Sequence, residues 1–112
     1  MEKKLPFVTL ETGGKSYMLR LTALSAIELE KSLSCSVYGG MERLSELKVV
    51  IEFLYALLKS FDPDITRSTV CMIYDDYISE GGSLRKMNNI IEKALDCSGF
   101  FDFGEDIAQQ KN

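Results

Sequence analysis

The stretch MERLSELKVVIEFLYALLKSF, residues 41–61, decides the fold of this chain. Read as a helix at about 100° per residue, its apolar side chains cover an arc of about 200°, whereas a surface helix of a monomer usually carries a stripe of roughly 100–140°. The wider arc predicts a helix that is packed on two sides. The polar strip is Ser45, Lys48, Glu52 and Lys59, and the apolar arc is Leu44, Leu47, Val50, Ile51, Phe53, Leu54, Tyr55, Leu57, Leu58 and Phe61.

The second side of this helix has two interpretations. In the first, the rest of the same domain wraps around a central helix. In the second, part of the arc at Phe53 and Leu57 contacts another chain. A chain of 112 residues has little material with which to surround a helix, which keeps the second interpretation open beside the first. Both stay open at this point, and Phe53 and Leu57 are candidate partner-binding residues.

The residues before this helix predict a β-hairpin and a first helix. Strand-forming residues at 7–10 and 17–21 flank the pair Gly13-Gly14, which can supply the positive φ angles of a turn. A helix is predicted over 23–33, with its apolar side defined by Leu24, Ile27 and Leu33. Residues 34–40 have the composition of a loop.

The residues after the central helix predict two further helices, over 67–80 and 84–98. Pro63 cannot continue a helix, and Gly81-Gly82 and Gly99 are helix stops. Met72 is expected to point outward from the third helix, as a single exposed apolar side chain. The expected fold is α+β and mostly α: an N-terminal β-hairpin followed by about four helices in a small bundle.

The end of the chain differs from the rest in charge. Residues 96–112 hold four of the 17 acidic and one of the 13 basic residues, a balance of −3 against −1 for residues 1–95. We expect one domain over residues 1–101 and an acidic, flexible tail over residues 102–112. Phe100, Phe101 and Phe103 are further candidate partner-binding residues, because aromatic side chains in such a segment can dock on a partner.

The composition argues against several classes of function. The formal net charge of −4 disfavours nucleic-acid binding, and no apolar run is long enough to cross a membrane. The absence of histidine removes Ser/His and Cys/His catalysis and most zinc sites. Three cysteines without a C-x-x-C pattern indicate reduced thiols in a cytosol. We expect no catalytic residues, no cofactor and no metal, and therefore not an enzyme.

Four segments together resemble a known family. They are YMLRLT at residues 17–22, IELEK at 27–31, DYISEGGSL at 76–84 and SGFF at 98–101. Their order and spacing resemble the small tail assembly chaperones of long-tailed bacteriophages and prophages of Gram-positive bacteria. The likeness covers roughly residues 8–101.

The resemblance implies a role in tail assembly. It implies binding to the tape measure protein, which the chaperone keeps soluble until tail tube subunits polymerise around it. It also implies contact with the tail tube protein through a frameshift-extended form, residence in the cytoplasm of the host bacterium and absence from the mature virion. A homo-oligomer that presents apolar grooves to a long helical client would suit this role.

Two other classes of function stay open. The first is a small acidic regulatory adaptor that binds and inhibits a host protein, with its acidic tail occupying a basic site. The second is a small-molecule-binding enzyme, for which the sequence shows no converging polar groups. A tail tube gene upstream and a very long helical reading frame downstream would favour the chaperone over the adaptor.

Overall fold

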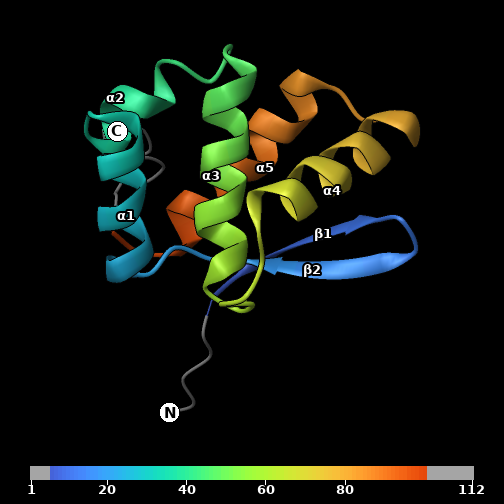
Figure 1. Cartoon of the computed structure of the whole chain (residues 1–112), viewed down its shortest axis with the longest axis horizontal. Coiled ribbons are helices and arrows are strands. Elements are labelled where there is room, and N and C mark those ends of the chain that lie inside the picture. The colour runs from blue at the N-terminus through green and yellow to red at the C-terminus, as the bar shows by residue number, and fades with distance from the viewer. Residues whose placement is uncertain (1–5, 101–112) are drawn as a thin grey trace, which may run out of the picture.

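The computed structural model describes residues 6–100 of the chain. In this part of the chain an antiparallel two-stranded hairpin precedes five helices (Figure 1). The predicted α+β, mostly α fold is confirmed. One helix more than expected is present, because the segment predicted as a loop contains a short one. The predicted tail, residues 102–112, lies outside the described residues.

The hairpin consists of β1 (Val8–Thr12) and β2 (Lys15–Leu19), paired from Val8 opposite Leu19 to Thr12 opposite Lys15. Gly13 and Gly14 form the turn with φ angles of 61° and 74°, which residues that carry a side chain rarely adopt. Pairing runs right up to this turn, so both strands lie nearer to it than the residues 7–10 and 17–21 predicted from composition.

Helix α1 (Ala23–Leu33) has the predicted bounds. Thr22 is its N-cap: the Thr22 hydroxyl accepts a hydrogen bond from the backbone N–H of Ser25, and the Ser25 hydroxyl accepts one from that of Thr22. This reciprocal pair satisfies two donors at the start of the helix. The capping box therefore joins Thr22 to Ser25.

The predicted helix over residues 41–61 is wrong at its start. The structure has a short α2 (Val37–Met41) inside the predicted loop, followed by α3 (Leu47–Lys59). Ser36 caps α2 by accepting a hydrogen bond from the Gly39 N–H. Residues 42–46 then turn, and this turn buries Leu44 in the core.

The last two helices are close to prediction. Helix α4 (Arg67–Ser79) is capped by Thr66, and α5 (Leu84–Cys97) is capped by Ser83. Gly81 and Gly99 follow these helices with φ angles of 101° and 87°. Glycine adopts such positive φ angles readily, so it suits the residue that ends a helix.

Helix α3 is central: it contacts α1, α4, α5 and β2 (Figure 1). The buried apolar side chains form one cluster that draws on the hairpin and all five helices. The end of α5 is held beside the segment that leads into α1, where the Ser98 hydroxyl accepts a 2.8 Å hydrogen bond from the Leu21 N–H. The hairpin tip is held to α4, since the Thr12 hydroxyl donates to the Glu80 carboxylate at 2.8 Å.

Candidate functional site

Two of the predicted partner-binding residues lie inside the domain. Phe53 and Leu57 are both 0% exposed, on the part of α3 that the other elements surround. The expectation that they form part of an exposed surface is wrong, and the interpretation of a central helix wrapped by its own domain is the right one. The physical reason is that four elements pack around α3, so the small domain does supply enough material.

The other predicted partner-binding residues lie on α4, just after α5, and beyond the described residues. Met72 on α4 is 65% exposed, as expected, and Phe100 is 48% exposed just beyond α5. Phe101 and Phe103 lie outside the described residues. Phe100 follows Ser98, which is bonded to Leu21 at the start of α1, whereas α4 lies on the other side of α3 (Figure 1). Met72 and Phe100 therefore do not share one surface.

The first helix carries exposed apolar residues that the sequence interpretation placed inside. Leu24 is 67% and Ile27 is 54% exposed, while Ser25, Leu29 and Leu33 of the same helix are buried. Leu29 and Leu33 are one turn apart, and this i, i+4 pair is the signal that indicates the inner face. The prediction that Leu24 and Ile27 pack inward is wrong, because α3 covers the opposite side of α1.

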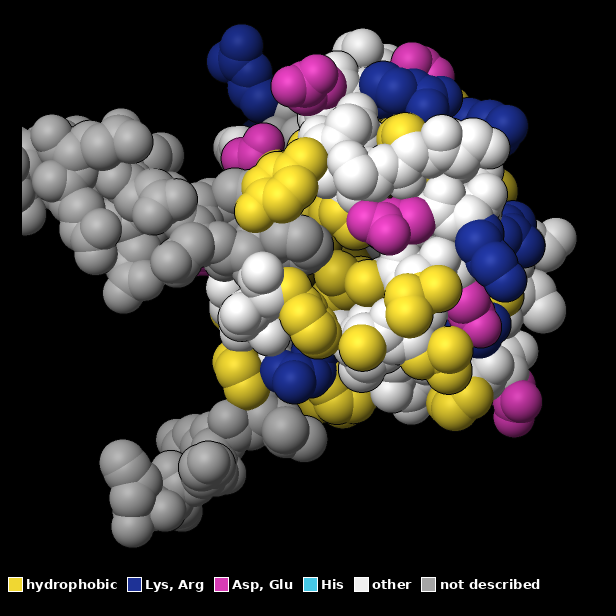
Figure 2. All heavy atoms as spheres, turned by 90° about the vertical axis from the view of Figure 1, so that its left-hand side faces the viewer, with side chains coloured by type: hydrophobic (Ala, Val, Ile, Leu, Met, Phe, Trp, Pro, Cys, Tyr) yellow, Lys and Arg dark blue, Asp and Glu magenta, His cyan; other side chains and the backbone are white. Residues whose placement is uncertain are grey.

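The face of the molecule that carries α1 and α2 is rich in apolar surface. Figure 2 shows hydrophobic side chains gathered across it, with charged side chains around them. Leu24 and Ile27 belong to α1, and Tyr38 of α2 is also exposed. Contiguous exposed apolar side chains are a common mark of a protein-binding surface. We call Leu24 and Ile27 together the α1 stripe.

A groove of about 380 Å³ lies beside this stripe, between α1 and α3. Buried Leu29 and Ala56 line its interior together with Tyr55, and charged residues of both helices line its edges. A second hollow of about 230 Å³, lined by Leu24 and Pro63, shares several residues with the first and continues the groove toward the start of α1.

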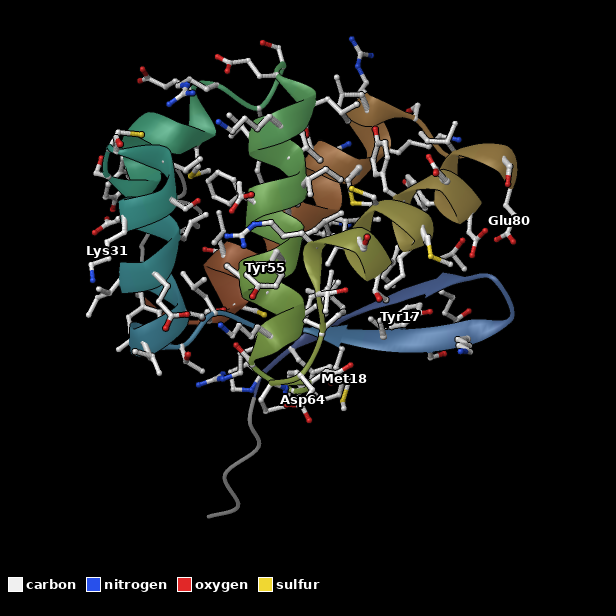
Figure 3. The ribbon with its side chains drawn as sticks, viewed as in Figure 1. Tyr17, Met18, Lys31, Tyr55, Asp64 and Glu80 are labelled. Carbon is white, nitrogen blue, oxygen red and sulfur yellow. The ribbon has the colours of Figure 1, made fainter. Side chains whose placement is uncertain are left out.

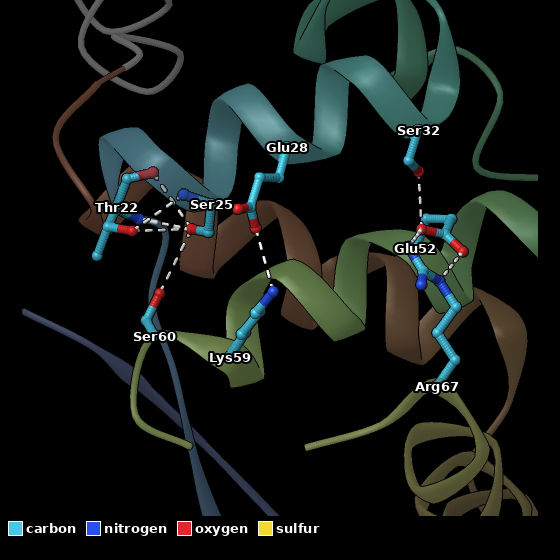
Figure 4. Close-up of polar contacts among 8 residues, drawn as sticks. All are labelled: Thr22, Ser25, Glu28, Ser32, Glu52, Lys59, Ser60 and Arg67. Atoms are coloured by element: carbon cyan, nitrogen blue, oxygen red, sulfur yellow. Dashed lines mark hydrogen bonds and ion pairs between the residues drawn. The ribbon is translucent and has the colours of Figure 1, made fainter. Parts of the chain in front are cut away.

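One carboxylate of the groove, Glu52, is held at three points (Figure 4). Arg67 donates from Nε to Oε2 at 2.8 Å and from Nη2 to Oε1 at 3.0 Å, and the Ser32 hydroxyl donates to Oε1 at 2.7 Å. Burial raises the pKa of the Glu52 carboxyl, but the bonds from Arg67 and Ser32 outweigh burial and hold this pKa below its ordinary value. The sequence interpretation placed Glu52 in the polar strip of the helix, and the structure shows that this member of the strip is buried.

Two cations lie close to the aromatic ring of Tyr55. Lys59 Nζ is 5.2 Å and Arg67 Cζ is 4.4 Å from the ring centroid. Lys59 also donates across the groove to Glu28 Oε1 on α1 at 3.2 Å (Figure 4). Figure 3 shows Tyr55 on α3 and Lys31 on the outer side of α1, and both residues are among those that line the groove.

The described residues offer no other chemistry of note. Among residues 6–100 no three His, Cys, Asp or Glu side chains are placed to hold a metal ion. The three cysteines are free thiols, and burial raises the pKa of Cys97. None of the helices in the described part of the chain is long and apolar enough to span a bilayer.

Comparisons with known protein families, with curated proteins and with solved structures find no match to this chain.

Proposed function

We propose that this protein is a tail assembly chaperone of a long-tailed bacteriophage or prophage of Gram-positive bacteria. It binds the tape measure protein and keeps it soluble until the tail tube polymerises. Its role is binding and not catalysis, and it acts in the cytoplasm of the host bacterium without entering the mature virion. The support comes from the resemblance of residues 17–22, 27–31, 76–84 and 98–101 to that family, together with one structural observation.

That observation is the exposed α1 stripe. Leu24 and Ile27 present apolar surface to solvent from a helix whose buried residues, Ser25, Leu29 and Leu33, lie on other sides of it. A long, amphipathic helical client needs its own apolar face covered before assembly, and an exposed helix with apolar residues at i and i+3 can pack against it. Each such contact is weak, so many copies along one client would provide the affinity through repetition.

The proposal includes two further partners. Copies of the chain associate with one another along the client, and the tail tube protein is recruited through a frameshift-extended form. The tube protein then displaces the chaperone as it polymerises. Light scattering of the purified chain measures the self-association that this arrangement requires.

Co-expression with the tape measure protein encoded in the same genome tests the function. The client should be soluble with the wild-type chain and largely insoluble with a variant that carries Leu24→Asp and Ile27→Asp. The control is Met72→Asp, which places one aspartate on an exposed apolar position of α4, and Leu24→Asp alone is its match in charge. A client that is equally insoluble with and without the wild-type chain refutes the chaperone function. If the client becomes insoluble with Met72→Asp but stays soluble with the α1 variant, the binding surface lies on α4 and not on α1.

A further inference from the structure

We propose that the groove between α1 and α3 binds an acidic, amphipathic helical segment of a partner protein. The inference deepens the proposed function and rests on it in taking this partner to be the chaperone's client. Three features carry the argument: the position of the groove beside the α1 stripe, its charge, and the spacing of residues along α1.

The groove and the stripe form one continuous surface. The two hollows share Ser25, Glu28 and Lys59, and the smaller one is lined by Leu24 of the stripe. A helix that packs on Leu24 and Ile27 therefore also lies along the edge of the groove. The apolar interior at Leu29 and Ala56 can accept part of an apolar side chain.

The charge of the groove is opposite to that of the chain. It is lined by three cations and two carboxylates, a balance of +1 on a chain whose net charge is −4. The carboxylates are already engaged, Glu52 with Arg67 and Glu28 with Lys59. Because the Glu52 side chain is only 11% exposed and that of Arg67 is 53% exposed, a ligand meets the cation first.

Unused donors remain at the edge. Lys31 makes no ion pair with any residue from 6 to 100, and Nη1 of Arg67 donates no hydrogen bond within that range. An ammonium and a guanidinium N–H at the edge of an apolar groove match the carboxylates of Asp and Glu. A basic or neutral partner would leave Lys31 without a charged counterpart, whereas Arg67 keeps Glu52 in either case.

The spacing along α1 matches a helical partner. Leu24, Ile27 and Lys31 stand at i, i+3 and i+7, which is one side of a helix. At a rise of 1.5 Å per residue these seven steps span about 10 Å, close to two helical turns. A partner helix packed along α1 would set apolar residues on the stripe and acidic residues against Lys31 and Lys59.

Two synthetic peptides test the charge preference. Both are fluorescein-labelled amphipathic helices of about 18 residues, long enough to be helical. They share leucines at i, i+3, i+4 and i+7, and one carries Glu where the other carries Lys. In fluorescence polarisation with the full chain, the Glu peptide should bind at least tenfold tighter than the Lys peptide, and salt should weaken its binding.

Variants locate the binding. Lys31→Glu removes a cation that has no ion pair to lose, and it should weaken the Glu peptide about threefold or more, as expected for one exposed charge pair and its reversal. Lys93→Glu is the matched control, an exposed lysine of α5 outside the groove, and it should leave binding unchanged. Circular dichroism of both variants confirms that the fold is retained.

Three results would overturn the inference. If the two peptides bind equally well, and only Leu24→Asp abolishes their binding, the α1 stripe is the site and the groove has no charge preference. Absence of binding by either peptide would reject the groove. A gain of tenfold or more on changing Asp102, Glu105 and Asp106 to their amides would assign the groove to the chain's own acidic end. The co-expression experiment is independent of all three, so the chaperone function can stand when this inference fails.

Discussion

The Arg67 guanidinium and the Glu52 carboxylate form a two-point ion pair, with 2.8 Å between Nε and Oε2 and 3.0 Å between Nη2 and Oε1. Arg67 is the first residue of α4 and Glu52 lies in α3, so the pair joins the start of one helix to the middle of another. Ser32 of α1 completes the cluster. Three helices therefore converge on one nearly buried carboxylate.

Removal of the arginine should destabilise the fold. In Arg67→Ala the Glu52 carboxylate keeps only the Ser32 hydroxyl, and the expected loss is about 1–2 kcal/mol of unfolding free energy, less than for a fully buried pair because Arg67 is half exposed. Urea unfolding followed by circular dichroism measures it. Arg85→Ala on the exposed side of α5 is the control and should change little. Equal effects of the two variants would contradict the role of the pair.

The same carboxylate should make stability depend on pH. Its pKa is lower in the folded state than the ordinary value of 4.5, so its contribution is present above about pH 4.5 and is lost as the pH falls below that value through the folded pKa. The wild-type chain should therefore lose more unfolding free energy between pH 5 and acidic pH than Glu52→Gln does. Parallel pH curves for both proteins would show that Glu52 makes no such contribution.

Two adjacent glycines should respond oppositely to alanine. A Cβ at Gly40 would lie 2.6 Å from Cδ1 of Leu33 and 3.1 Å from the Phe53 ring, both in the core, so Gly40→Ala should cost about 1–2 kcal/mol. A Cβ at Gly39 finds only ordinary contacts at 3.5 Å, so Gly39→Ala should be neutral or gain up to about 1 kcal/mol from helix propensity. Thermal unfolding of the two variants, compared with wild type, checks the sign of each change.

The two sides of α1 should differ sharply in their effect on stability. Leu29→Ala opens a cavity in the core and should cost about 2–4 kcal/mol. Leu24→Ala changes an exposed side chain and should stay within about 0.5 kcal/mol of wild type, although we expect it to weaken client binding. Chemical denaturation gives both values. Similar losses would show that Leu24 is covered in solution, for instance by a second copy of the chain.

Local signals determined much of the fold. The glycine pair predicted the hairpin turn, and the residues at 23–33 predicted α1 to the residue. The two helices predicted after Pro63, with their glycine stops, agree with α4 and α5 to within one residue at each end. These signals work because a cap or a positive φ angle is decided by residues adjacent in the chain. The wide apolar arc correctly predicted a helix packed on two sides.

Only the tertiary structure decided which surfaces are covered and by what. A helical wheel gives the width of an apolar face, but burial depends on neighbours that come from distant parts of the chain. For this reason Phe53 and Leu57 lie in the core, whereas Leu24 and Ile27 lie on the surface. For the same reason Glu52 is buried and paired with Arg67, which is fifteen residues later in the chain. The groove exists because α1 packs against α3, a pairing between segments that no local pattern specifies.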